Sequence, residues 1–402
     1  MTLAPGSTGS ARYVVLAGIS AALHVAKLSP ALPALRRDLG VSLVTSGALL
    51  SLVALAAALT ALVVGLLVER YGLRRSQLTG LAVLTVTGVA GGLAPNGDVL
   101  LGIRAVEGIG FLLATVPAPA LIRRLAVPGH LDRMLGVWGA FMPVGTALAL
   151  FVGAGVIDAW SWPGWWWLTA ALSALSAALL AWRVPADPAR PASVEGQASV
   201  VGRRARETLT HVAPWLLALT FACYSSQWLA VVGFLPSIYA EAGWGAGTVA
   251  VLAALVALAN AAGNIGAGFA LHHGVGARTT LATGFAAMAV GAALAFAGPT
   301  AGLPVVQYAG ALVFSAFGGL VPGSLFALAP RLAPSESTIS TTVGWMTQWS
   351  SLGQLTGPPL VAWLAVAVGG WHLTWAATGA ASVVGMGLAL AVTGPQRARR
   401  PA

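Results

Sequence analysis

The amino-acid sequence predicts an all-α membrane protein with twelve transmembrane helices in two pseudo-symmetric halves of six. Three observations support this fold class. Of the 402 residues, 57% are hydrophobic and only 8% are charged, whereas an average soluble domain has about 25% charged residues. Apolar runs long enough to cross a bilayer core of about 30 Å recur along the chain. One long polar stretch divides these runs into two equal groups.

Each apolar run suits one membrane-spanning helix, which needs roughly 20 apolar residues. The runs of the first group are Tyr13–Leu35, Val44–Val68, Gln77–Leu93, Val99–Ile122, Met134–Ile157 and Trp162–Trp182. Those of the second group are Pro214–Tyr239, Thr248–Leu271, Thr279–Phe296, Pro304–Leu328, Ser340–Val368 and His372–Val392.

The polar stretch between the two groups carries too many charged residues and prolines to insert into a bilayer. We therefore expect an N-terminal half at residues 1–183, a cytoplasmic linker at 184–212 and a C-terminal half at 213–402. A weak internal repeat supports two related halves. Arg124-Leu125-Ala126 with Pro128 ends the fourth run, and Arg331-Leu332-Ala333 with Pro334 ends the tenth.

The distribution of arginine predicts the orientation of the chain. The net charge of +10 could suggest a nucleic-acid partner, but the charges lie in short clusters between apolar runs, as the positive-inside rule expects. With both termini in the cytoplasm of an inner-membrane protein, only Arg36 and Arg37 face outward. The inward-facing arginines are Arg12, Arg70, Arg74, Arg75, Arg123, Arg124, Arg133, Arg183, Arg190, Arg203, Arg204, Arg206, Arg278, Arg331, Arg397, Arg399 and Arg400. We expect no nucleic-acid partner.

Several kinds of functional site are absent from the sequence. There is no glycine-rich phosphate-binding loop ending in Lys-Ser or Lys-Thr, no Cys/His metal spacing and no nucleophile elbow. The single cysteine, Cys223, excludes an intrachain disulfide. We therefore expect no enzymatic activity, no cofactor and no metal, and we expect a monomer whose other partner is membrane lipid.

A short loop between the second and third runs combines a carboxylate with several arginines. A carboxylate there can pair with arginines and with the N-terminus of a neighbouring helix, and a glycine permits a tight turn. The alternative is a plain basic cytoplasmic loop. The loop resembles the signature of the major facilitator superfamily, with Glu69 in place of the usual aspartate. The matching residues, which the resemblance implies act as a conformational latch, are Gly65, Glu69, Arg70, Gly72, Arg74 and Arg75.

Four charged or titratable residues lie inside two of the expected helices. Lys27, the only lysine, follows His24 by three residues, and Glu107 follows Arg104 by three, so each pair shares a helix face. Arg104 and Lys27 are expected at similar depths. Charges in a membrane helix favour a functional role because they are costly. The alternatives are that Lys27 extends to the interface and that Arg104 and Glu107 form a structural pair.

The resemblance to the superfamily extends to this region. The stretch from Arg104 to Gly110 is similar to the fourth-helix motif of the family, with Glu107 in place of an amide. Because helices one, four, seven and ten line the central cavity in that family, the resemblance places both charged helices on the transport path. The stretch from Lys27 to Ser42 loosely resembles the cyanate and nitroimidazole transporter branch.

The second half offers neutral polar and aromatic side chains for a binding site. An isolated amide in a membrane is more often a contact between helices than a ligand contact, and for Asn260 and Asn264 both interpretations stay open. The candidates are Tyr224, Gln227, Asn260, Asn264, Trp345 and Gln348.

These residues lead to a hypothesis of alternating-access transport of a small anion, such as a carboxylate. Lys27 and Arg104 would hold its charge, and Glu107 or His24 would carry a coupling proton. One alternative is a proton-driven efflux pump for apolar, drug-like compounds, with Glu107 as the proton carrier. Another is a membrane sensor that binds a ligand without transporting it.

Overall fold

The computed structural model describes residues 8–41, 43–127, 129–188 and 197–393. Four of the arginines used to orient the chain, Arg190, Arg397, Arg399 and Arg400, lie outside these ranges, as do Ser42 and Pro128. The described residues form sixteen α-helices and three short 3₁₀ helices, η1 (Gly298–Thr300), η2 (Glu336–Thr338) and η3 (Trp371–Leu373). The α-helices are α1 (Thr8–Ala26), α2 (Leu28–Asp38), α3 (Leu43–Tyr71), α4 (Leu73–Gly92), α5 (Gly97–Thr115), α6 (Ala118–Leu125), α7 (Leu131–Gly139), α8 (Phe141–Arg183), α9 (Gln197–Thr210), α10 (Val212–Glu241), α11 (Ala246–His272), α12 (Ala277–Phe296), α13 (Pro304–Gly318), α14 (Leu320–Leu332), α15 (Ile339–Val368) and α16 (Thr374–Val392).

The predicted all-α fold class is confirmed. In the described residues, eleven helical segments are long and apolar enough to cross a membrane. The remaining expected span is α4, which is less apolar because Arg74, Arg75 and Gln77 lie in its first turns. It packs between α5 and α8 and completes the twelve.

Several expected single helices are broken. The first expected helix divides into α1 and α2 at Lys27, the fourth into α5 and α6, and the tenth into α13 and α14 at Gly319. Pro30 explains the first break, since it offers no N–H to the carbonyl of Ala26. The expected fifth helix begins as α7 and continues, after a break at Ala140, as the first part of α8. The second part of α8, beyond a sharp turn at Ser161 (φ 64°), is the expected sixth helix.

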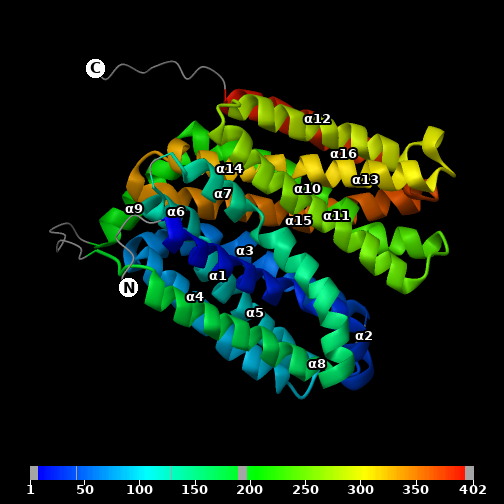
Figure 1. Ribbon diagram of the computed structural model, residues 1–402, viewed down its shortest axis with the longest axis horizontal. Helices are drawn as coiled ribbons and strands as arrows, with labels where there is room; N and C mark the ends of the chain where they lie inside the picture. The colour runs from blue at the N-terminus through cyan, green and yellow to red at the C-terminus, as the bar shows by residue number, and fades with distance from the viewer. Residues whose placement is uncertain (1–7, 42, 128, 189–196, 394–402) are drawn as a thin grey trace.

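The two halves lie against each other over part of their length. In Figure 1, α1, α2, α4, α5 and α8 form one side of the bundle, and α10, α12, α13, α14 and α16 form the other. Contacts between the halves run mainly through α3 with α15 and through α7 with α11. At the right of Figure 1, α2 and the middle of α8 lie apart from the ends of α11 and α13.

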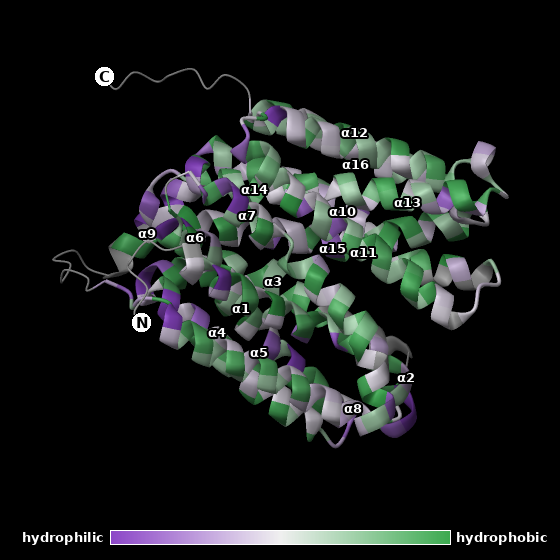
Figure 2. Cartoon of the chain, viewed as in Figure 1, coloured by the Kyte–Doolittle hydropathy of each residue, from purple (hydrophilic) through white to green (hydrophobic). Residues whose placement is uncertain are grey.

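Hydrophilic residues gather at one end of the bundle, which we call the linker end because α9 lies there. Figure 2 shows this end in purple around α9 and α6, while the long helices beyond it are mostly green and white. Two ion pairs join the halves here. Arg331 binds Asp132 at 2.6 Å, and Arg123 binds Glu336 at 2.6 Å. The polar side chains therefore tie the halves together at the linker end.

Small residues bring the backbones of the two halves into direct contact. A Cβ on Gly344 of α15 would lie 2.4 Å from the carbonyl oxygen of Ala61 on α3, and one on Gly136 of α7 would lie 2.4 Å from the Cα of Gly268 on α11. Such close approach between membrane helices requires glycine. The linker end is consequently closed by packed backbone as well as by ion pairs.

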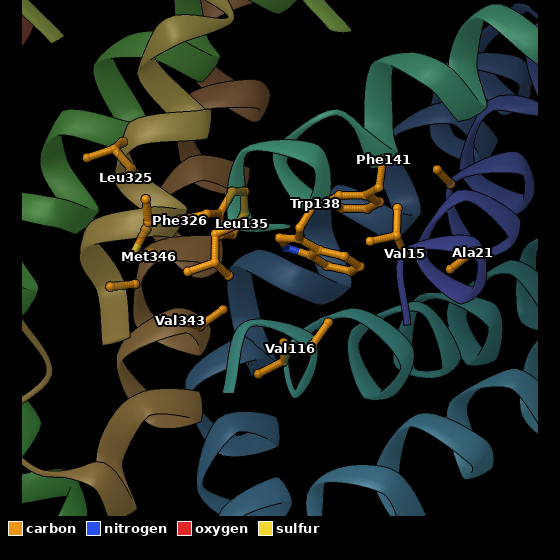
Figure 3. Close-up of a cluster of buried hydrophobic side chains, with 14 of the residues drawn as sticks. Val15, Ala21, Val116, Leu135, Trp138, Phe141, Leu325, Phe326, Val343 and Met346 are labelled. Atoms are coloured by element: carbon orange, nitrogen blue, oxygen red, sulfur yellow. The ribbon is translucent and has the colours of Figure 1, made fainter. Parts of the chain in front are cut away.

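An aromatic core lies between the halves next to these contacts. Trp138 stacks on Phe141 with ring centroids 4.4 Å apart and meets Phe326 of the other half edge-on at 6.4 Å. Figure 3 shows Trp138 between Val15 on one side and Leu325 and Phe326 on the other. Trp138 is fully buried, so this core seals the centre of the molecule on its linker side.

Candidate functional site

The four charged or titratable residues predicted inside the membrane surround the carboxylate of Glu107. Lys27 Nζ donates to Glu107 Oε1 at 2.6 Å, and Arg104 Nη1 donates to Oε2 at 2.6 Å. His24 Nδ1 lies 2.5 Å from Oε1. All four side chains are 0–1% exposed. The two sequence pairs therefore form one enclosed group, which we call the charged cluster.

The break between α1 and α2 positions the charged cluster. Arg104 Nη1 also donates to the carbonyl of His24 at 2.6 Å, and Trp165 Nε1 donates to the carbonyl of Lys27 at 3.0 Å. Backbone groups at a break inside a membrane need such partners. The same Arg104 side chain thus stabilises both the break and the carboxylate of Glu107.

His24 connects the charged cluster to α8. Its Nε2 lies 2.9 Å from Ser173 Oγ, which lies 2.8 Å from Ser20 Oγ. Nδ1 also lies 3.1 Å from Lys27 Nζ, and Nε2 lies 3.3 Å from the carbonyl oxygen of Thr169. A neutral imidazole with its proton on Nδ1 donates to Glu107 and accepts from the Ser173 hydroxyl, whereas one with its proton on Nε2 accepts from Lys27 and donates to Ser173 or Thr169. We call Ser20, Ser173, His24 and Glu107 the hydrogen-bonded row. It can pass a proton to the carboxylate.

The charged cluster holds more positive than negative charge. Glu107 is the single carboxylate among two fixed cations, Lys27 and Arg104. The Lys27 ammonium also lies 4.9 Å from the ring centroid of Trp166, a cation–π contact that offsets part of its desolvation. Arg104 Nε is buried without a hydrogen-bond partner. The site therefore has an unused donor beside an excess of positive charge.

A second polar group lies in the C-terminal half. Asn260 Nδ2 on α11 donates to the hydroxyl of Tyr224 on α10 at 3.0 Å and to the carbonyl of Ser315 on α13 at 2.8 Å. Asn264 Nδ2 donates to Asn260 Oδ1 at 3.0 Å, while Asn264 Oδ1 has no partner. A Cβ on Gly139 of the other half would lie 2.5 Å from that oxygen. Tyr224, Asn260 and Asn264 thus form one group that reaches the boundary between the halves.

The remaining binding candidates of the C-terminal half make other contacts. Gln227 Oε1 accepts from Ser382 of α16 at 2.8 Å. Gln348 Oε1 accepts from the N–H of Leu62 on α3 at 3.0 Å, which joins the two halves. Trp345 packs edge-on against Trp215 with centroids 4.7 Å apart. These three residues bind side chains and backbone outside the group of Tyr224, Asn260 and Asn264, and their roles in binding stay predictions.

The predicted latch loop connects the two halves. Glu69 Oε1 accepts from the backbone N–H of Ser340 at 2.6 Å, at the first turn of α15, where a helix favours negative charge. Gly65 faces the same segment, since a Cβ there would lie 2.6 Å from the carbonyl oxygen of Ser340. The carboxylate of Glu69 therefore caps a helix of the opposite half. Its role as a conformational latch stays a prediction.

Asp187 is a partner of the loop that the sequence reasoning missed. Its carboxylate accepts from the backbone N–H groups of Arg74 and Arg75 at 3.1 and 3.0 Å, and from Arg124 Nη1 at 2.7 Å. A Cβ on Gly72, whose φ is +113°, would lie 2.6 Å from Asp187 Oδ2. Burial alone would raise the pKa of Asp187, but these hydrogen bonds outweigh it and hold the pKa below its ordinary value of 3.8.

The structure describes two further contributors that no sequence argument identified, Ser173 and Trp165. Both come from α8, which the charge pattern did not connect with the first and fourth helices. A signal was present for Ser173, because Thr169 and Ser173 are four residues apart and so share one face of a membrane helix. Polar residues at this spacing indicate a face turned toward protein.

Comparison with known proteins agrees with the fold. Residues 14–337 and 216–402 match the family model of the Major Facilitator Superfamily. The proton:xylose symporter XylE superposes with a TM-score of 0.74 at 16% identity, covering 94% of each chain. The transporter FucP in the outward conformation superposes with a TM-score of 0.74 at 15% identity, covering 95% of this chain and 98% of that one.

Curated relatives are similar over shorter stretches. A chloramphenicol efflux pump of Mycobacterium tuberculosis is 37% identical over 179 residues, 44% of this chain and 42% of that protein. The 2-nitroimidazole transporter of Escherichia coli is 27% identical over 278 residues, 68% of this chain and 69% of that protein. The matches to an uncharacterized MFS-type transporter and to multidrug resistance protein Stp, both of M. tuberculosis, cover 24% and 20% of those proteins. The family match spans most of the chain, which belongs to the Major Facilitator Superfamily.

Proposed function

We propose that the chain is a secondary transporter that moves a small, carboxylate-like anion across the cytoplasmic membrane by alternating access. The observation that carries this proposal is the charged cluster, where two buried cations share one carboxylate. Arg104 Nε, a buried donor without a partner, adds capacity for one more acceptor. Leaving a buried charged donor unpaired is costly. Binding of an anion to Arg104 during transport gives a physical reason for this unpaired donor.

Alternating access follows from the way in which the halves meet. They are joined at the linker end by Glu69 with Ser340 and by Asp132 with Arg331. We propose that this end is cytoplasmic, as the arginine distribution predicts, and that transport requires these contacts to separate. The described structure is then a state closed toward the cytoplasm.

Counterflow in proteoliposomes tests the proposed function. Purified protein would be assayed with radiolabelled pyruvate, lactate and benzoate, using protein-free liposomes to subtract passive diffusion of the acids. We expect counterflow by the wild type and its loss in Lys27→Met and Arg104→Gln. The exposed Arg36→Gln serves as the matched control and keeps wild-type flux. Wild-type flux in both cluster variants would overturn the proposal.

A second candidate is proton-driven efflux of neutral, apolar compounds. It is supported by the names of the relatives, which include a chloramphenicol efflux pump and a 2-nitroimidazole transporter, and by the aromatic core around Trp138. Susceptibility of an expressing strain to chloramphenicol and 2-nitroimidazole distinguishes the two functions. Efflux predicts resistance that depends on Glu107, whereas anion transport predicts no change in susceptibility.

A further inference from the structure

We propose that the C-terminal half holds a second ligand site, which takes an uncharged, one-ring aromatic molecule that carries a hydrogen-bond acceptor. The site is a cavity of about 180 Å³ beside Tyr239, which we call the tyrosine pocket. It is separate from the charged cluster, and it does not depend on the proposed anion transport. Its evidence is the composition of its walls and one buried hydroxyl without a partner.

The walls of the tyrosine pocket come only from the C-terminal half. The last turns of α10, the loop after it and the end of α12 form one part, and the start of α13 and η3 form the rest. These segments lie opposite the linker end, at the right of Figure 1. Tyr239 lies about 22 Å beyond Tyr224 along α10, so the pocket is also distinct from the group of Tyr224, Asn260 and Asn264.

The end of α10 builds an aromatic wall for the pocket. Gly243 has a φ of +85°, a left-handed conformation that glycine adopts at helix ends. The chain then turns back, and the N–H of Trp244 donates to the carbonyl of Tyr239 at 3.1 Å. This bond holds the two rings in a stack with centroids 5.4 Å apart and 17° between their planes. The wall is therefore formed before any ligand binds.

The hydroxyl of Tyr239 is the unused polar group of the pocket. Tyr239 is 8% exposed, and its hydroxyl has no hydrogen-bond partner among the described residues. The other two tyrosines of this half differ, since Tyr308 donates to the carbonyl of Leu252 at 3.3 Å and Tyr224 donates to Asn260 at 3.2 Å. An unpaired buried hydroxyl is costly. A ligand acceptor in the cavity that Tyr239 lines removes this cost.

The size and charge of the pocket define the class of ligand. A cavity of about 150 Å³ holds benzene in another protein, so the tyrosine pocket suits one ring with a small substituent. Phe296 and Trp371 add aromatic surface to the stacked pair, which favours an aromatic ligand. No aspartate, glutamate, lysine or arginine lines the cavity. A charged molecule would lose its hydration there without an opposite charge, so the ligand is neutral.

Binding of two fluorinated probes of the same shape tests the proposal. The probes are 4-fluoroacetophenone, whose carbonyl accepts a hydrogen bond, and 4-fluoro-α-methylstyrene, which has a CH₂ group in place of that oxygen. Fluorine NMR would measure the dissociation constant of each probe for the protein in lipid nanodiscs, with empty nanodiscs as the reference. We expect saturable binding of both probes to the wild type.

The variant Tyr239→Phe removes only the hydroxyl. It should weaken the binding of 4-fluoroacetophenone roughly tenfold, as expected for a lost buried hydrogen bond, and leave 4-fluoro-α-methylstyrene unchanged. Tyr308→Phe is the matched control, because its hydroxyl already has a backbone partner, and it should bind both probes like the wild type.

A second pair of variants locates the site independently of the hydroxyl. Ala242 lines the cavity and is exposed, so Ala242→Phe should fill the space and abolish binding of both probes. Ala309 is equally exposed but lies outside the cavity walls, and Ala309→Phe should keep both affinities. Benzoate has a similar size but carries a charge, and an excess of benzoate should displace neither probe.

Four results would overturn the assignment. Tyr239→Phe could leave the affinity for 4-fluoroacetophenone unchanged, or weaken both probes equally, which indicates lost packing. Displacement by benzoate would place the probes in the anion site. Binding in detergent that disappears in nanodiscs would show that a lipid chain occupies the pocket. Benzoate counterflow is measured separately, so failure of this inference leaves the proposed anion transport in place.

Discussion

At the residue scale, Glu107 is the centre of the charged cluster, because its carboxylate contacts His24, Lys27 and Arg104. Through Arg104 it also supports the break between α1 and α2. Its carboxylate compensates Lys27 and Arg104, and Arg104 in turn donates to the carbonyl of His24 at 2.6 Å. Removing one partner of a buried ion pair leaves an uncompensated charge, which costs about 3–5 kcal/mol. Removing both partners of the pair costs less stability than the sum of the two single removals.

The first prediction is a double-mutant cycle on this pair. Glu107→Gln should lower the apparent melting temperature in detergent by roughly 5 °C or more, because it leaves two uncompensated cations. Lys27→Met should lower it less, because Glu107 stays paired with Arg104. The double variant should be less destabilised than the two losses together, because it leaves one uncompensated cation, Arg104, instead of two. Thermal unfolding measures all three, with Asp98→Asn as a control expected to match the wild type. Strictly additive losses would contradict a coupled pair.

The second prediction concerns Ser173, which hydrogen-bonds His24 Nε2. Ser173→Ala should slow uptake driven by a pH gradient while leaving the equilibrium affinity for benzoate close to that of the wild type. The reason is that the hydrogen-bonded row loses a link, but the cation pair keeps its geometry. Ser176→Ala, one turn further along α8, is the matched control. An affinity loss equal to the rate loss would show that Ser173 acts only through structure.

The sequence predicted the members of the charged cluster but not its full set of contacts. The spacing of three residues in His24/Lys27 and in Arg104/Glu107 places each pair on one face, which any helix would do. The meeting of the two pairs came only from family resemblance, since spacing along one helix says nothing about its neighbour. Ser173 and Trp165 were missed because their roles depend on tertiary packing of α8.

At the element scale, the contact of α3 with α15 holds the linker end closed. Glycines allow the two backbones to touch, and Glu69 caps α15 at 2.6 Å. This is the part of the structure where a single added methyl group has a large geometric effect, because the nearest atoms are backbone and cannot move aside.

The third prediction is that Gly344→Ala opens the linker end. Its Cβ would lie 2.4 Å from the carbonyl oxygen of Ala61, so α15 must shift away from α3. The measurement is cross-linking of cysteines at Asp132 and Arg331 with a short bifunctional thiol reagent, in a Cys223→Ser background. Gly344→Ala should lower the yield severalfold, and Gly379→Ala, where the space is open, should not. Equal yields would contradict the assigned role of this contact.

The fourth prediction concerns Asp187, which joins the N-terminus of α4 to Arg124. Because the pKa of Asp187 is lowered from 3.8 in the folded protein, its ionised form adds stability above that pH. This stability is lost as the pH falls through the lowered value. Asp187→Asn should therefore melt at a lower temperature than wild type at pH 7, and the difference should shrink below about pH 4. A difference independent of pH would contradict a charge-dependent contact.

The positions of the long helices were predictable from hydropathy, whereas their breaks were only partly so. Pro30 indicates the break at Lys27, because a proline removes a helical hydrogen bond. Pro143 indicates the break after Gly139 that separates α7 from α8 in the same way, because it offers no N–H to the carbonyl of Gly139. The stacking of Trp138 on Phe141 across this break depends on tertiary packing, which the sequence does not indicate.

At the scale of the whole molecule, the chain combines a buried charged cluster in the N-terminal half with a buried group of neutral polar side chains in the C-terminal half. The charged cluster lies entirely on α1, α2 and α5 with support from α8, while Tyr224 and Asn260 lie on α10 and α11. The division into two halves was predictable because one polar stretch interrupts the apolar runs. The partners of Glu69 and Asp187 were not predictable, since the contacts of both residues form only when helix ends that are distant in sequence meet.

The central claim is that Lys27 and Arg104 hold an anion. The most direct measurement is equilibrium binding of radiolabelled benzoate, with pyruvate and lactate as competitors, to purified wild type, Arg104→Gln and Arg36→Gln. We predict saturable binding to wild type and Arg36→Gln, and an affinity loss of about tenfold or more in Arg104→Gln, as expected for a lost charge-assisted hydrogen bond. Binding to Arg104→Gln with the affinity of the wild type would contradict the claim.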